Sequence, residues 1–171
     1  MPAETIEAER LILVRPQMQH LASYVAYCAS DRARFVGGPF DAAKAFEKLC
    51  AMAGHWTLRG FGRYVITLRD TGEAIGHVGA LQIDDSDLPE MTWTLWTDEA
   101  EGQGYAFEAA RAYLAQAAAV TGTTELLIRI DPNNVRSHDL AARLEATIDP
   151  MAPPPYRPDV VTYRVRTAGS V

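Results

Sequence analysis

The sequence predicts a mixed α+β fold, in which a β-sheet carries helices on both of its faces. Two observations indicate this class. Apolar residues alternate at period two in several short segments and recur at helical spacing in others, and the two kinds of segment follow one another along the chain. With 171 residues and no internal boundary, residues 1–171 are expected to form one domain with a substantial core. A parallel pairing is expected wherever a helix lies between two neighbouring strands.

The first half of the chain is expected to hold a strand, two helices and a β-hairpin. Pro16 ends the first strand, and Asp41 is a good N-cap for the second helix. The hairpin turns at Asp70-Thr71-Gly72. The expected elements are a strand over 9–15, a helix from about 18 to 30, a helix from about 42 to 60, and strands over 63–69 and 73–83.

The second half is expected to alternate strands and helices. Met91, Trp93 and Leu95 alternate with polar residues, which is typical of a half-buried strand. Asn134 is placed to cap a helix after the apolar Leu-Leu-Ile-Arg-Ile strand. The expected elements are a strand over 90–96, a helix from about 104, a strand over 125–130, a helix to about 144 and a strand over 159–166.

Composition and charge narrow the class of partner. A hydrophobic content of 48% with 22% charged residues is ordinary for a soluble globular protein. The net charge of −6 argues against nucleic acid and anionic membranes as partners and slightly favours a cationic substrate. No segment has the pattern of a signal peptide or the length of an apolar membrane span, so a cytoplasmic protein is expected.

The two cysteines give no indication of a metal site or a disulfide. Cys28 and Cys50 lack both Cys-x-x-Cys and histidine spacing. Both are therefore expected to be buried core thiols, and no metal is expected.

A glycine-rich turn lies between the strand over 90–96 and the following helix. Its sequence, Glu-Gly-Gln-Gly-Tyr-Ala over 101–106, exposes backbone N–H groups at a helix N-terminus. Anions, and phosphates above all, bind at such a position. A tight loop without a ligand is an equally good interpretation of this pattern alone.

The order of elements, this turn and the segment Asp-Pro-Asn-Asn-Val-Arg-Ser over 131–137 resemble the GNAT superfamily of acetyl-CoA-dependent N-acetyltransferases. More narrowly, the chain is similar to the branch of the ribosomal-protein N-terminal acetyltransferases. That branch opens with Thr-x-Arg-Leu-x-Leu-Arg, to which residues 7–15 correspond, and the likeness extends from about 9 to 164. The turn matches the pattern Gln/Arg-x-x-Gly-x-Gly/Ala at Gly104 and Ala106, whereas Glu101 stands where Arg or Gln is usual.

The resemblance implies a mostly antiparallel sheet of six to seven strands, with central strands splayed around acetyl-CoA as co-substrate. The backbone of the turn would bind the pyrophosphate, with no help from the Glu101 side chain. The pantetheine arm would pair with the strand edge, where the N–H of Leu95 or Trp96 would polarise the thioester carbonyl. Asn134 would contact the cofactor, cap the helix, or do both. The implied cofactor-binding residues are Thr94, Leu95, Trp96, Gly102, Gln103, Gly104, Tyr105, Ala106, Asn134 and Ser137.

The same resemblance gives a candidate acid. Ser137 lies where the ribosomal-protein branch places a hydroxyl that can reprotonate the leaving thiolate, although water could also supply that proton. Other members use a Tyr seven residues after the Asn. That position is Ala141 here, which excludes a tyrosine acid from this helix.

Glu90 is the candidate base, acting on the acceptor amine directly or through water, since it shares a strand face with Thr92 and Thr94. The alternative is a solvated carboxylate at the end of a strand. His77 and His138 are alternative bases, each more in keeping with a structural histidine. Trp93, on the opposite face, is expected to be only a core aromatic.

The expected class of acceptor follows from how easily its amine loses a proton. An α-amine with a pKa of about 7.7–8 is partly neutral at pH 7, whereas a lysine near 10.4 needs a base. We therefore expect a protein N-terminal α-amine or a small-molecule amine as acceptor. A possible homodimer rests on family analogy alone.

Two departures from the family pattern motivate a different hypothesis, in which the chain is a non-catalytic acetyl-CoA-binding or regulatory protein with the GNAT fold. One is Glu101. The other is Glu145, which stands where relatives carry a glycine at a helix end, so this helix must exit differently or with strain. The segment 148–155 after it also departs, and in this family it borders the acceptor site.

Overall fold

The computed structural model describes residues 3–85, 87–150 and 159–167. Within these ranges the chain forms an eight-stranded sheet in the order β1-β2-β3-β4-β5-β6-β8-β7. The strands are β1 (Thr5–Glu7), β2 (Leu11–Val14), β3 (Arg63–Leu68), β4 (Ala74–Leu81), β5 (Glu90–Leu95), β6 (Glu125–Ile130), β7 (Thr147–Ile148) and β8 (Val161–Arg166). The helices are α1 (Leu21–Ala29), α2 (Ala42–Arg59), α3 (Tyr105–Thr121) and α4 (Val135–Arg143), with 3-10 helices η1 (Met18–His20) and η2 (Asp31–Val36). None of these helices is long and apolar enough to cross a membrane.

The mixed, mostly antiparallel sheet confirms the predicted class, with two strands more than the lower expected number. The additional strands β1 and β7 have three and two residues, too few to produce a readable alternation of apolar side chains. Both lie at the two ends of the sheet, where β1 pairs with β2 and β7 pairs with β8.

The prediction of parallel pairing across every intervening helix is wrong, because only β5 and β6 are parallel. Between β2 and β3 the chain passes through two helices, α1 and α2, which carry it away and back to the same end of the sheet, and so β3 pairs antiparallel. Between β6 and β8 it passes through α4 and then β7, and this extra strand reverses the direction once more.

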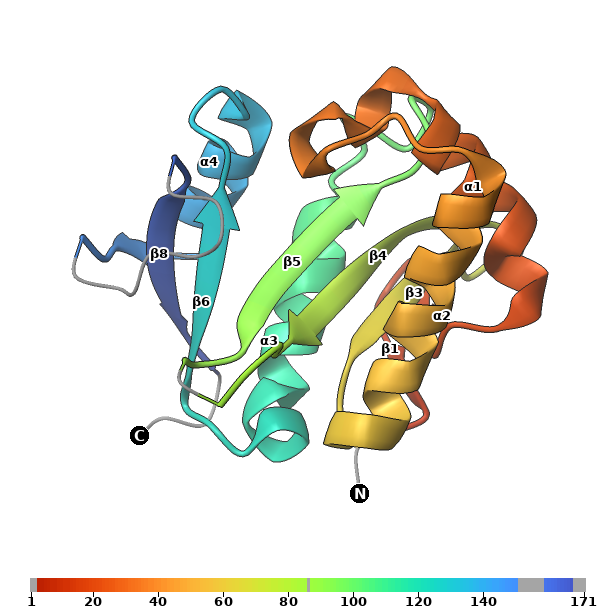
Figure 1. Cartoon of the computed structure of the whole chain (residues 1–171). Helices are drawn as coiled ribbons and strands as arrows, with labels where there is room; N and C mark the ends of the chain where they lie inside the picture. Colours follow the sequence, from red (N-terminus) through yellow and green to blue (C-terminus); the bar gives the residue numbers. More distant parts are fainter. Residues whose placement is uncertain (1–2, 86, 151–158, 168–171) are drawn as a thin grey trace.

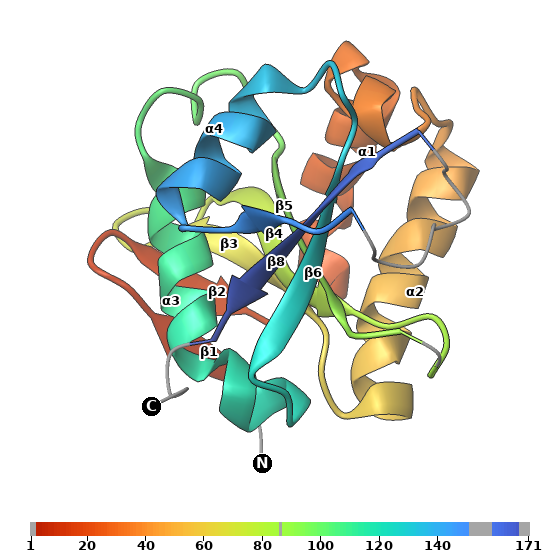
Figure 2. The same ribbon diagram turned by 90° about the vertical axis from the view of Figure 1, so that its left-hand side faces the viewer.

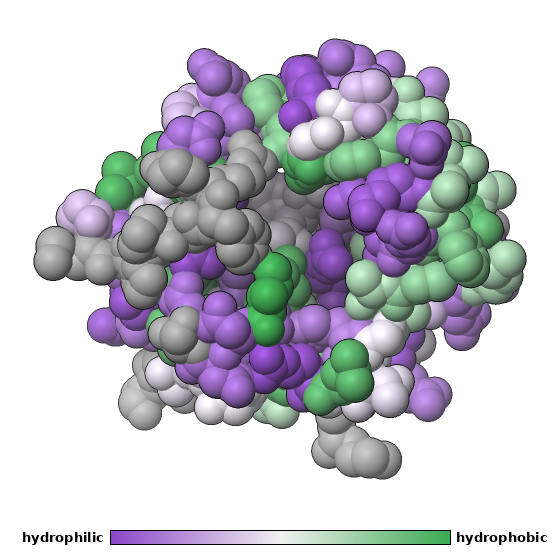
Figure 3. All heavy atoms as spheres, in the orientation of Figure 1, coloured by the Kyte–Doolittle hydropathy of each residue, from purple (hydrophilic) through white to green (hydrophobic). Residues whose placement is uncertain are grey.

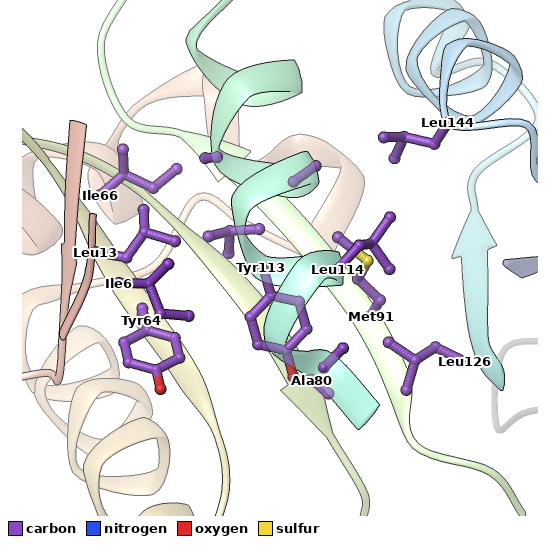
Figure 4. Close-up of a cluster of buried hydrophobic side chains, with 14 of the residues drawn as sticks. Ile6, Leu13, Tyr64, Ile66, Ala80, Met91, Tyr113, Leu114, Leu126 and Leu144 are labelled. Atoms are coloured by element: carbon purple, nitrogen blue, oxygen red, sulfur yellow. The ribbon is translucent and has the colours of Figure 1, made fainter. Parts of the chain in front are cut away.

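The helices cover the two faces in pairs, as expected. Figure 2 shows α1 and α2 on one side of the sheet and α3 and α4 on the other. One core cluster lies between the sheet and α3 and contains Tyr113 of α3 together with the strand residues Leu13, Ile66 and Met91 (Figure 4). The second core cluster lies under α1 and α2 and contains Tyr24, Tyr27, Cys28, Met52 and Trp96. The sheet is therefore buried on both faces.

The cysteines do not share one environment. Cys28 is buried as predicted, but Cys50 is exposed on the outer face of α2, so its assignment to the core is wrong. Helical spacing alone placed it close to the apolar stripe. The buried face of α2 is formed instead by Ala45, Leu49, Met52 and Trp56.

The exit of α4 is the strained alternative predicted from Glu145. Glu145 has a φ of 59°, in the left-handed region where glycine is usual. The backbone nevertheless forms a complete C-terminal cap, because Glu145 N donates to Ala142 O at 3.0 Å and Ala146 N donates to Ala141 O at 3.0 Å. The chain thus forms the left-handed cap and accepts the strain of a side chain in it.

Candidate active site

An opening between β5 and β6 is the central feature of the site. The two parallel strands share a single register pair, Glu90 with Leu127, and Leu127 N donates to Pro89 O at 3.0 Å. Beyond that point they diverge, as Figure 1 shows. In the same orientation, the surface is hollowed between the α1–α2 side and the α4 side of the molecule (Figure 3). The sequence-based expectation of splayed central strands is met here.

Gly76 explains how β5 leans away from β6. A Cβ at Gly76 would overlap the carbonyl oxygen of Thr94 and would lie 3.2 Å from Leu95 Cα. Trp96 N donates to Ile75 O at 2.7 Å, which draws the end of β5 onto β4. A glycine is therefore required where the two backbones approach.

The same hydrogen bond decides between the two amides predicted to polarise the thioester. Trp96 N is occupied by Ile75 O, so it has no capacity left for a ligand. Because successive N–H groups of a strand point in opposite directions, Leu95 N points away from β4 and toward the opening. Leu95 is the remaining candidate of the pair.

The glycine-rich turn forms the N-terminus of α3. Gly104 is the N-cap residue with a φ of 80°, and Gly102 has a φ of 72°. No side chain caps this end, and the first N–H groups of a helix have no intrahelical partner. The backbone donors of Tyr105 and Ala106 are thus available to an anion, as predicted from the sequence.

Arg10 binds both the turn and the first turn of α3. Its Nη1 donates to Gln103 O at 2.9 Å, and its Nε donates to Glu108 Oε2 at 2.7 Å. Its guanidinium also lies 4.6 Å from the centre of the Tyr105 ring. In the sequence Arg10 served only to establish the resemblance, and no local pattern indicated a contact 93 residues away.

Glu101 is paired with two arginines that sequence reasoning missed. Arg32 Nη2 donates to Glu101 Oε1 at 2.6 Å, and Arg136 Nη1 contacts Glu101 Oε2. Arg32 also donates through Nε and Nη2 to Leu95 O, at 3.2 Å each. Glu101 therefore connects the turn, the end of β5 and the start of α4.

The start of α4 brings Asn134 and Ser137 to the opening. Asn134 is the N-cap, and its side-chain oxygen accepts from Ser137 N at 3.3 Å. Ser137 Oγ accepts from Trp93 Nε1 at 3.3 Å. Trp93 packs against the α3-side core cluster, as predicted for a core aromatic, and its indole N–H also contacts Ser137. Its position on the same face as Met91 was predicted correctly.

Glu90 lies at the closed end of the opening, on the other face of β5. Its side chain is 17% exposed, and its Oε2 accepts from Arg129 Nη1 at 2.9 Å. Asp87 also binds Arg129. Burial raises the pKa of Glu90, and Arg129 acts in the opposite direction. The alternative of a solvated strand-end carboxylate is wrong.

Two threonines extend the Glu90 face toward the end of β5. The Thr94 side chain is hydrogen-bonded to Tyr27, whose pKa burial raises to about 12. Thr92 Oγ1 is buried and has no hydrogen-bond partner among the described residues. A buried hydroxyl without a partner is costly, so this face holds unused hydrogen-bonding capacity.

The two histidines are held by structural contacts. His77 Nδ1 accepts from Trp96 Nε1 at 2.9 Å, and burial lowers the pKa of His77 well below its usual value. His138 lies within 2.7 Å of the Tyr163 hydroxyl through Nδ1 and within 3.1 Å of Asp131 O through Nε2. These contacts are in keeping with the interpretation of each as a structural histidine.

A family model of the acetyltransferase (GNAT) domain matches residues 10–147. The chain belongs to the GNAT acetyltransferase family. It is therefore an acetyltransferase, with acetyl-CoA as its co-substrate. Among curated proteins, no significant match is found.

Solved structures agree with this assignment. An acetyltransferase from Agrobacterium tumefaciens is 32% identical and has a TM-score of 0.88, with 97% of this chain and 96% of that chain covered. RimL, a ribosomal α-N-protein acetyltransferase in complex with coenzyme A, is 18% identical with a TM-score of 0.78, covering 95% and 98%. MccE, a microcin self-immunity acetyltransferase in complex with acetyl-CoA and AMP, is 13% identical with a TM-score of 0.73, covering 92% and 93%. At these lower identities the last two share the fold.

Proposed function

We propose that this acetyltransferase transfers the acetyl group to a primary amine, either a protein N-terminal α-amine or a small-molecule amine. The observation that carries the proposal is the opening between β5 and β6. It has a hydroxyl, Ser137, on one side and a half-buried carboxylate, Glu90, on the other. An acid and a base on opposite sides of the reacting carbonyl are what amine acetylation requires.

Two groups would act on the thioester, and a third would position one of them. Leu95 N–H would stabilise the negative charge that develops on the carbonyl oxygen, and Arg32 holds Leu95 in place through its carbonyl oxygen. Ser137 would return a proton to the leaving thiolate. Since Ser137 Oγ already accepts a hydrogen bond from Trp93, its own proton is directed elsewhere.

Glu90 would take the proton of the acceptor through water. Trp93, which contacts Ser137, is three positions after Glu90, or about 10 Å along a strand. At this separation a water would carry the proton from the amine to Glu90. Thr92, with its unsatisfied hydroxyl, lies between Glu90 and Trp93 on the Glu90 face. A raised pKa makes Glu90 a better base than an exposed carboxylate.

The acceptor class is supported by charge and by the neighbours. The protein has a net charge of −6, which favours a cationic ligand. RimL, which shares the fold, is an α-N-protein acetyltransferase. Part of the segment 148–155 expected to border the acceptor lies outside the described residues. The non-catalytic hypothesis loses one of its two reasons, since Glu101 is neutralised by two arginines.

The experiment measures free thiol released from acetyl-CoA in the presence of peptides with free N-termini, small amines and lysine side-chain analogues. Release that requires an α-amine or a small amine supports the proposal. If coenzyme A binds but no amine causes release of free thiol, the proposal is contradicted and the non-catalytic hypothesis is favoured.

Two matched variants assign the base. Glu90→Gln should slow transfer to a lysine-type amine more than transfer to an α-amine, because the former is almost fully protonated at pH 7. Asp87→Asn, which weakens the same contact with Arg129, should leave this ratio unchanged. Equal effects of the two variants would mean that Glu90 acts only through its ion pair.

A further inference from the structure

Three arginines lie near the glycine-rich turn, and they differ in their exposure and in the hydrogen bonds that their guanidinium groups already make. Arg10 has a 45% exposed side chain and donates through Nη1 to Gln103 O and through Nε to Glu108. Arg32 has an 18% exposed side chain and donates to Leu95 O, Asp98 and Glu101. Arg136 has a 75% exposed side chain, and its one ion pair among the described residues is with Glu101.

We propose that Arg136 binds the pyrophosphate of acetyl-CoA and supplies the side-chain charge that the turn itself lacks. The inference rests on the proposed placement of the pyrophosphate on the backbone amides of 102–106. The cation comes from the first turn of α4 and meets the turn at Glu101.

Glu101 makes a cation at this place necessary. Its carboxylate is held by Arg32 at 2.6 Å next to Gly102, so it stays beside the site when a phosphate binds. A carboxylate next to two phosphate groups is repulsive unless a second cation joins them. A guanidinium has five N–H donors in a planar fork and can bridge a carboxylate and a phosphate at once.

The location of Arg136 also fits the path of the cofactor. Arg136 follows Asn134, the N-cap of α4, on the β6 side of the opening, while Glu101 begins the turn on the β5 side. Their ion pair thus spans the mouth of the opening. A cofactor with its pyrophosphate on the turn would therefore lie near the guanidinium, because Arg136 contacts Glu101, the residue before Gly102.

The test is calorimetric titration of coenzyme A and of dephospho-coenzyme A, which keeps the pyrophosphate but lacks the 3′-phosphate. Arg136→Gln should weaken the binding of both ligands by the same factor, about tenfold. This is the low end for a charge-assisted hydrogen bond, because the site is exposed. The control is Arg143→Gln, which removes the same charge from the other end of α4 and should leave both affinities unchanged.

A double variant separates contact from mere neutralisation. If Arg136 binds phosphate, Glu101→Gln/Arg136→Gln should remain weaker than Glu101→Gln alone by a similar factor. Recovery of wild-type affinity in the double variant would overturn the inference, because Arg136 would then only neutralise Glu101.

Three other results would also test the contact between Arg136 and the pyrophosphate. Tighter binding by Arg136→Gln would overturn the inference, since the ion pair would then be an obstacle to the cofactor. A loss confined to coenzyme A would assign Arg136 to the 3′-phosphate and reject the pyrophosphate contact. If wild-type protein failed to bind either ligand, the proposed site itself would fail, which is a different outcome from equal binding by wild type and variant.

Discussion

Gly76→Ala tests the physical origin of the cofactor opening. The added methyl group would overlap Thr94 O and approach Leu95 Cα at 3.2 Å and Ile66 Cδ1 at 3.3 Å. Two of these three atoms belong to the backbone of β5, so a change of rotamer cannot relieve the overlap. The strand must move away from β4, which means toward β6 and into the opening.

The cost can be worked out from these contacts. Overpacking that forces a shift of the backbone costs about 1–3 kcal/mol, and the 2.7 Å hydrogen bond from Trp96 N to Ile75 O is weakened as well. A loss of about 2 kcal/mol corresponds to a fall in Tm of about 4–8 °C for a chain of this size. Displacement of Leu95 by a fraction of an ångström should also reduce acetyl transfer by about tenfold or more.

Thermal unfolding and thiol release measure the two effects on the same preparation. Gly54→Ala is the control, because Gly54 lies within α2 and a Cβ there meets nothing within 4 Å. That substitution should stabilise by up to about 1 kcal/mol and leave the rate unchanged. A Gly76→Ala protein with wild-type stability and wild-type rate would refute the explanation of the splayed strands.

Three further predictions concern single positions. Gly104→Asp puts a side chain at a left-handed φ of 80°, with its Cβ 3.5 Å from Arg10 Nη2, and should weaken coenzyme A binding by distorting the turn, with the fold retained; unchanged affinity by calorimetry would refute the site. Glu145→Gly should raise the stability by about 1 kcal/mol in chemical unfolding, since φ there is 59°, and a loss of stability would show that the strain is absent. His77 binds no proton when folded but does when unfolded, so stability should fall by about 1 kcal/mol between pH 7 and pH 5.5. His77→Gln should lose less over that range, and parallel pH curves would contradict the burial argument.

The sign for His77 follows from its lowered pKa. Because burial depresses the folded pKa below the unfolded value of 6.5, the unfolded state takes up a proton first as the pH falls. The contribution of His77 to stability is therefore present above pH 6.5 and is lost below it.

Local patterns were sufficient for most of the fold. The strand β6 lies where its apolar run predicted it, and the helix α2 begins after the predicted Asp41 cap and ends near residue 60, as expected. The direction in which strands pair could not be read from local patterns alone. It depends on the connection, because two helices between β2 and β3 give an antiparallel pair and a single helix between β5 and β6 gives a parallel one. The very short strand β7 could not be read from its two residues.

The candidate site was predictable where a backbone or a motif defines it. Gly102, Gly104 and Asn134 lie at the helix ends assigned to them. Contacts between distant segments were not predictable. The pairing of Glu101 with Arg32 spans 69 residues, and no local pattern indicates it. For the same reason the hydrogen bond from Trp93 to Ser137, 44 residues apart, emerged only from the structure.

The most direct test of the account is a structure of the protein with acetyl-CoA, read at the distance from Leu95 N to the thioester carbonyl oxygen. We expect a hydrogen bond of about 2.7–3.2 Å, with the pyrophosphate on the backbone of 102–106. A thioester carbonyl bound elsewhere, or a cofactor outside the opening between β5 and β6, would contradict it.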